Sequence, residues 1–94
     1  MHIADIICLP DILDKLAWQH HVSPEEVVEA LSTHALYRKG QKGPIPGEDL
    51  YAACGQTEAG RYLIVFFIYK PTQEALIISA RDMDAKERRQ YGRR

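Results

Sequence analysis

Residues 62–69 read Tyr-Leu-Ile-Val-Phe-Phe-Ile-Tyr, an unbroken run of eight apolar or aromatic positions. A half-buried strand alternates apolar and polar side chains, whereas a strand covered on both faces is apolar throughout. The run is far shorter than the roughly 18 residues that a membrane-spanning helix needs. It therefore predicts the central strand of a sheet.

Strands are expected on both sides of this run. The central strand spans 61–70, and apolar segments at 49–54 and 75–81 flank it. Because the connections over 55–60 and 71–74 are short, neighbouring strands should run antiparallel. A further strand at 36–39 precedes a loop over 40–47, which contains three glycines and two prolines. The glycine spacing of this loop fits neither of the common phosphate-binding motifs.

Helices are expected before and after these strands. Apolar positions recur with helical spacing from Asp11 to His20, after a short first strand over 3–9. Ser23-Pro-Glu-Glu26 and Asp84-Ala-Lys-Glu87 are capping-box patterns that predict two helix starts, and the last helix should run to Gly92. We therefore predict one α+β domain over residues 1–94. Two N-terminal helices and a C-terminal basic helix should pack on a small antiparallel sheet of about four strands.

Composition predicts a soluble globular protein of the cytoplasm. The chain is 46% hydrophobic and 27% charged, and its N-terminus has no secretory signal pattern. Its two cysteines, Cys8 and Cys54, have no metal-ligand spacing and are expected to be small core residues. Charge is unevenly distributed, because residues 1–37 carry six acids against one lysine whereas 81–94 carry six bases against three acids. This asymmetry suggests an acidic ligand at one end of the molecule.

Arginine is the residue type that best suggests chemistry. Arg61 opens the central strand, Arg81 ends the next strand, and Arg88 and Arg89 lie on the last helix. Guanidinium groups suit bidentate phosphate binding and stabilise charge on a transferring phosphoryl group. The alternative is an ordinary solvated basic surface. No metal-binding histidine motif and no serine nucleophile motif occurs, so neither a metal nor a cofactor is expected.

Three segments together resemble the BrnT toxins. They are Gln19-His-His-Val-Ser-Pro-Glu-Glu26, the Gly60-Arg61 turn with the strand after it, and Ile77-Ile-Ser-Ala-Arg81 followed by Lys86-Glu-Arg-Arg-Gln-Tyr91. The resemblance covers nearly the whole chain after about Pro10. It implies a fold like that of the RelE-type ribonucleases, cleavage of RNA to inhibit translation, and a partner antitoxin similar to BrnA.

The resemblance also implies roles for particular residues. Arg81 and Arg88 would hold the scissile phosphate, His20 would transfer protons and Glu87 would orient an arginine. RNA-binding residues would be Arg61, Lys86, Arg89 and Tyr91. The expected activity is a metal-independent RNA endonuclease.

Departures from the family pattern leave other functions open. The family usually has Lys-His-Gly where this chain has Gln19-His20-His21, and a basic residue where this chain has Leu76. A catalytically degenerate domain that binds RNA or a protein partner would tolerate the loss of both cations. A metabolic enzyme for a small ligand is a third possibility, although no motif favours it.

Overall fold

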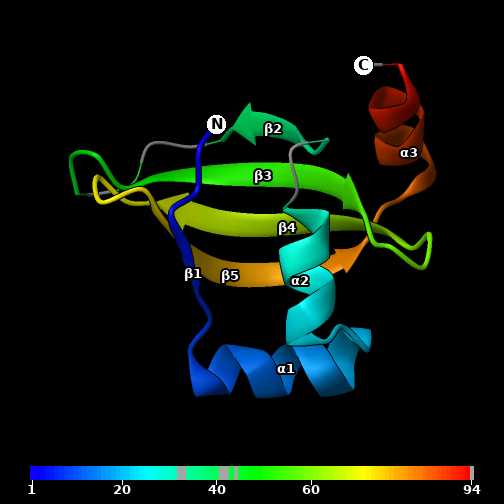
Figure 1. Cartoon of the computed structure of the whole chain (residues 1–94), viewed down its shortest axis with the longest axis horizontal. Helices are drawn as coiled ribbons and strands as arrows, with labels where there is room; N and C mark the ends of the chain where they lie inside the picture. Colours follow the sequence, from blue (N-terminus) through cyan, green and yellow to red (C-terminus); the bar gives the residue numbers. More distant parts are fainter. Residues whose placement is uncertain (32–33, 41–42, 44, 94) are drawn as a thin grey trace.

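A computed structural model describes residues 1–31, 34–40, 43 and 45–93 of the chain. The expected 40–47 loop therefore has Gln41, Lys42 and Pro44 outside the described residues. Figure 1 shows one sheet accompanied by helices, one of which crosses in front of its strands. The elements, in chain order, are β1 (Asp5–Ile7), α1 (Pro10–His20), α2 (Pro24–Ala30), β2 (Leu36–Lys39), β3 (Asp49–Gln56), β4 (Tyr62–Tyr69), β5 (Glu74–Asp82) and α3 (Ala85–Gly92).

The sheet confirms the α+β class but corrects the strand count and the purely antiparallel prediction. Five strands lie in the order β1-β5-β4-β3-β2, and β4 is central as expected. The strands from β2 to β5 form an antiparallel meander, whereas β1 pairs with β5 in parallel. The parallel pair arises because β1 and β5 are distant in sequence, so no tight hairpin constrains their direction. The sheet is therefore mixed.

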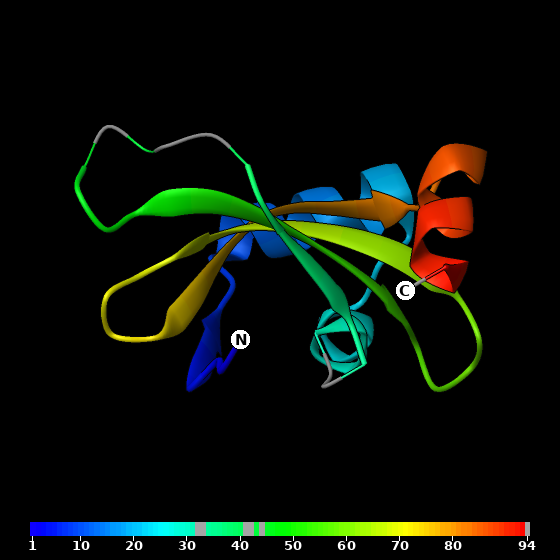
Figure 2. The same cartoon turned by 90° about the horizontal axis from the view of Figure 1, so that it is seen from above.

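Each side of β4 belongs to a different hydrophobic cluster. Leu63, Val65 and Phe67 are fully buried in a large core with α1 and α2, whereas Ile64 joins a smaller cluster with Met83 and Tyr91. Figure 2 shows α2 and α3 on opposite sides of the sheet. The three predicted helices thus pack on two different faces of the sheet, α1 and α2 on one side and α3 on the other.

Local chemistry sets the helix starts. Ser23 caps α2 by accepting a hydrogen bond from the Glu26 amide at 3.2 Å, while the Glu26 carboxylate accepts one from the Ser23 amide at 3.0 Å. Asp84 and Glu87 make the same reciprocal pair at the start of α3. Both predicted capping boxes are confirmed. α1 ends at His21, whose φ of 53° is left-handed and turns the chain toward α2.

α2 packs unusually close to β3 at Gly55. A Cβ placed on Gly55 would lie 1.9 Å from the main-chain oxygen of Ala30, so only glycine allows this approach. This contact holds α2 against the sheet. Among the described residues, no helix has the length and the apolar character that crossing a membrane requires.

Candidate functional site

Arg81 and Glu87 form a bidentate ion pair at the base of α3. Arg81 Nη1 and Nη2 donate to Glu87 Oε1 and Oε2 at 2.8 and 2.9 Å, and the guanidinium carbon lies 5.5 Å from the centre of the Phe66 ring. The Arg81 side chain keeps 38% of its surface exposed, against 18% for Glu87. The carboxylate and the ring therefore fix the orientation of Arg81 while leaving it accessible.

The ion pair also fixes the charge of Glu87. Its hydrogen bonds from Arg81, with a further one from the Asp84 amide, lower the pKa of Glu87 against the opposing effect of burial. The same pair raises the pKa of Arg81. Since Glu87 stays ionised well into acid, it is suited to orienting Arg81 and poorly suited to accepting a proton near neutral pH.

Arg88 lies one helical turn into α3 and stacks on an aromatic ring. Its guanidinium carbon is 4.4 Å from the centre of the Tyr62 ring, and Tyr62 meets Tyr91 edge-on with ring centres 6.0 Å apart. These side chains border an open pocket of about 280 Å³, lined by Tyr62, Arg88, Arg89, Tyr91 and Gly92. A planar cation beside aromatic rings at the edge of an open pocket is an arrangement found where single-stranded nucleic acid binds.

Arg61 lies on the other side of the sheet, in a network of its own. Its Nε donates to Asp82 at 2.8 Å, and its terminal nitrogens donate to Glu26 and to the main-chain oxygens of His20 and His21. Each guanidinium nitrogen therefore has an acceptor within the protein. The Arg61 hydrogen bond is the main cause that lowers the pKa of Asp82, and the positive charge of Arg61 adds to it against the opposing effect of burial.

The main-chain oxygen of His20 accepts from the same Arg61 side chain that binds Asp82, so the end of α1 lies on the side of β5 opposite to Arg81. Consecutive residues of a strand point to opposite faces, so Arg81 and Asp82 end β5 with one side chain on each side. The predicted catalytic residues His20 and Arg81 therefore lie near the same end of β5, but on opposite faces of the sheet.

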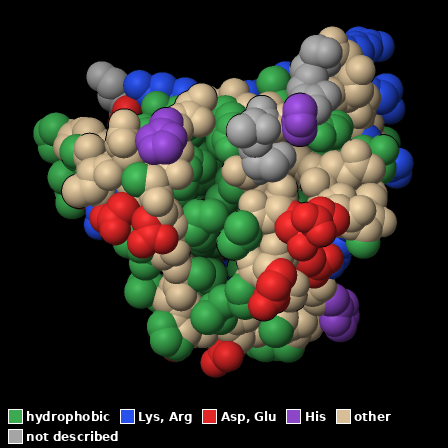
Figure 3. Space-filling model, viewed as in Figure 1, with side chains coloured by type: hydrophobic (Ala, Val, Ile, Leu, Met, Phe, Trp, Pro, Cys, Tyr) green, Lys and Arg blue, Asp and Glu red, His purple; other side chains and the backbone are tan. Residues whose placement is uncertain are grey.

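Not every residue predicted from the sequence falls in one place. The structure brings Arg81, Glu87, Arg88, Arg89 and Tyr91 together around α3, and Lys86 is exposed on the same helix. Arg61 and His20 lie across the sheet from them. In Figure 3, acidic side chains gather over α2, whereas lysine and arginine side chains follow the margin beside α3.

Sequence reasoning missed the aromatic partners Tyr62 and Phe66. They occupy alternate positions of β4 on the α3 side, four residues apart, and each receives one arginine. Strand periodicity puts Tyr62 and Phe66 on one face of β4, but the sequence alone does not say that α3 packs on that face.

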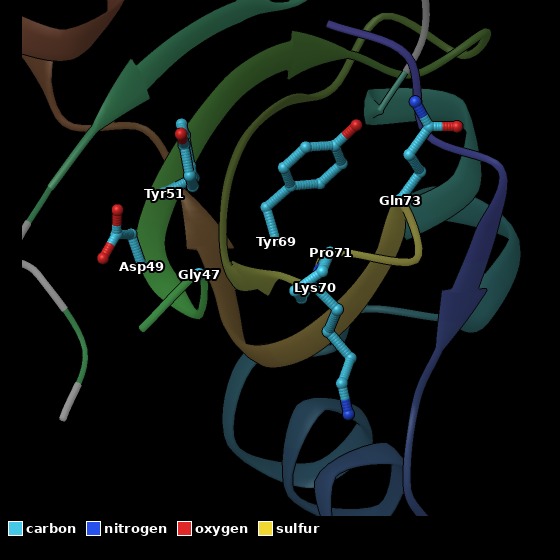
Figure 4. Close-up of a pocket in the computed structure, with 7 residues that line it drawn as sticks. All are labelled: Gly47, Asp49, Tyr51, Tyr69, Lys70, Pro71 and Gln73. Atoms are coloured by element: carbon cyan, nitrogen blue, oxygen red, sulfur yellow. The ribbon is translucent and has the colours of Figure 1, made fainter. Parts of the chain in front are cut away.

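A second pocket, of about 370 Å³, lies at the far end of the sheet. Figure 4 shows Tyr51 and Tyr69 beside this opening, with Lys70 directed away from them. Asp49 at its margin forms an ion pair with Lys39 at 3.0 Å. No residue predicted to be functional lines it. Within the described ranges, no three His, Cys, Asp or Glu side chains gather as metal ligands would.

Comparison with protein-family models and with curated proteins found no match to this chain.

Proposed function

We propose that this protein is a ribonuclease toxin that cleaves RNA and thereby inhibits translation. The observation that supports it is the pair of accessible arginines beside α3, each held in place by another side chain. Arg81 is fixed by Glu87 and Phe66, and Arg88 is fixed by Tyr62. The likeness to BrnT toxins and their RelE-like fold is part of the same proposal.

The two arginines suit different parts of a phosphodiester chain. Arg81 and Arg88 stack on rings that are four residues apart on one face of β4, which corresponds to roughly 13 Å along the strand. Arg81 would stabilise charge on the phosphoryl group under attack, and Arg88 with Arg89 would hold a neighbouring phosphate. Tyr62 and Tyr91 would contact a base or sugar at the pocket.

The proposed reaction is attack of the RNA 2′-hydroxyl on the adjacent phosphorus, with the 5′-oxygen as leaving group. It requires a proton acceptor, a proton donor and charge stabilisation, but no metal ion. Histidine is the side chain whose ordinary pKa is closest to neutral pH, so His20 is the proposed proton carrier. Because His20 lies across β5 from Arg81, the RNA would have to bend around the end of that strand for both side chains to reach the scissile phosphate.

The test is cleavage of single-stranded RNA by purified protein in the presence of a chelator. We expect products with 2′,3′-cyclic phosphate ends, and no cleavage of the same sequence made as DNA. Expression in bacteria should arrest growth, and the Arg81→Ala variant should not. Intact RNA together with normal growth at high expression would refute the proposal.

A second function, binding without catalysis, is favoured by two observations. Glu87 neutralises Arg81, and His20 lies across β5 from it. In that case the α3 side would bind RNA through phosphate charge alone, with affinity that falls steeply as salt rises. RNA binding that survives Arg81→Ala with no cleavage by either protein would favour this second function.

An antitoxin similar to BrnA, encoded beside the toxin, is part of the first proposal. The basic surface of α3 would accept an acidic segment of such a partner, giving a hetero-oligomer. Co-expression with the protein from the adjoining reading frame should restore growth. The two proteins should then co-purify as a stable complex.

A further inference from the structure

The α3 side of the sheet carries a row of apolar side chains that crosses four strands. Register places Ile7, Leu76, Ile68 and Leu50 side by side on β1, β5, β4 and β3. Their strand neighbours Ile6 and Ala75 pack into the large core, so this row points the other way. All four are partly exposed. We call the side of the sheet that holds this row the open face.

A second row continues the open face toward α3. Ala52 and Phe66 are in register and only partly covered. A β-bulge places both Ile78 and Ser79 opposite Phe66, and Ile78 is 39% exposed. Of the elements described, only α3 packs on this side, and it covers the Cys54 and Ile64 end. A contiguous exposed apolar surface of this kind marks an interaction site.

Opposite charges lie at the two ends of the open face. Asp5 and Glu74 are in register beyond Ile7 and Leu76, and both share the side of those residues. Arg81, paired with Glu87, lies seven residues or roughly 23 Å along β5 from Glu74. The exposed Lys86, Arg88 and Arg89 of α3 make this end of the face basic. Arg38, in register with Ala52, adds to the basic end. The face is therefore acidic at one end, apolar in the middle and basic at the other.

We infer that the open face binds a second copy of this chain. Consider a twofold axis that lies in the interface and is perpendicular to the strands. Rotation about it brings the two open faces together with their strand directions reversed. It places Glu74 of one copy over the basic end of the other, and apolar rows against apolar rows, as an isologous interface requires. An acidic partner segment would match only the basic end and would meet Asp5 and Glu74 with like charge.

The dimensions of the layers allow this arrangement. Facing sheets pack about 10 Å apart, and a helix with its side chains is about 10–12 Å across. The projecting α3 of each copy therefore fits beside the sheet of the other, with its Lys86 and Arg89 toward the partner's acidic end. This inference rests on the open face, which includes Phe66 and the margin of the proposed RNA site. Its test measures self-association and does not depend on RNA cleavage.

Sedimentation velocity of the full chain tests the inference, over roughly 1–200 µM protein at low and high salt. We expect reversible dimerisation that Ile78→Lys weakens at least tenfold. The matched control is Val28→Lys, because Val28 is an exposed aliphatic residue of α2 on the opposite side of the sheet. It should leave the equilibrium unchanged.

A charge variant keeps the test valid if Ile78→Lys fails to fold. Glu74→Lys should weaken the dimer at low salt and have little effect at high salt, while Glu25→Lys on α2 should have no effect. A wild-type protein that stays monomeric at every concentration would overturn the inference. So would a dimer that Val28→Lys disrupts and Ile78→Lys does not.

Discussion

Arg61 and Asp82 are joined at 2.8 Å, linking the turn before β4 to the last residue of β5. The same guanidinium also donates to the main-chain oxygens of His20 and His21, where α1 ends. One side chain therefore ties the sheet to the junction of the two N-terminal helices. The sequence predicts that Arg61 binds RNA, whereas its contacts in the structure are those of a residue that stabilises the fold.

Replacing Arg61 with Ala should lower the free energy of unfolding by about 2 kcal/mol, since two main-chain oxygens and two carboxylates lose a charged donor. Chemical denaturation followed by circular dichroism measures the change. The matched control is Arg88→Ala, which removes a surface arginine that stacks on one ring and should cost less than half as much. Equal effects would contradict the structural role of Arg61.

Stability should fall as the solution becomes acid. Arginine hydrogen bonds hold the pKa values of Asp82 and Glu87 below normal, while the Ser23 amide is the main cause for Glu26. A carboxylate with a depressed folded pKa stabilises the protein fully above its unfolded pKa, near 4, and loses that contribution as pH drops through the folded value. Denaturation midpoints measured from pH 7 to pH 3 should show this decline.

The matched variants for the pH experiment are Arg61→Gln and Arg81→Gln. Each removes the cation that lowers a carboxylate pKa, so each should flatten the acid limb of the curve relative to wild type. If a variant loses stability as steeply as the wild type when the pH is lowered, these ion pairs do not control acid sensitivity.

Gly55→Ala should destabilise the fold by about 1–3 kcal/mol, because its methyl group would collide with the main chain at Ala30. Thermal and denaturant unfolding report the change. Gly92→Ala is the control: it lies in α3, nothing is within 4 Å of an added Cβ, and alanine has the higher helix propensity. Its stability should be unchanged or slightly higher. Tolerance of Gly55→Ala would mean that α2 can move away from β3.

Arg81→Lys should reduce RNA cleavage about 100-fold while RNA affinity changes little, since lysine keeps the charge but loses the planar fork that Glu87 orients. Glu87→Gln should have a similar but smaller effect. Single-turnover cleavage and fluorescence anisotropy separate the rate from the affinity. A loss of affinity with no loss of rate would assign Arg81 to binding alone.

Features that depend on neighbouring residues could be predicted from the sequence. The capping boxes at Ser23 and Asp84 follow from four-residue patterns, and the central position of β4 follows from its unbroken apolar run. The meander was predictable because its connections are short. Even the strand at 36–39 has its expected bounds.

Features that depend on distant residues could not be predicted in the same way. The three residues of β1 carry no signal of their partner, and their parallel pairing with β5 joins segments 69 positions apart in the sequence. The network of Arg61 joins it to residues 21 to 41 positions away. The sequence groups Arg61 with the other arginines, because a sequence shows the charge of a residue but not the face of the sheet on which its side chain lies.

The pairing of β1 with residues 74–76 also governs when the chain can finish folding. On the ribosome β1 is made well before β5, the strand that pairs with it among the described residues, because Asp5 and Glu74 are 69 positions apart. Closing so long a loop is entropically costly and favours late, slow docking. Until then the nascent N-terminal segment exposes Ile6 and Ile7 without a partner strand, so this is the stage at which a chaperone would be most useful.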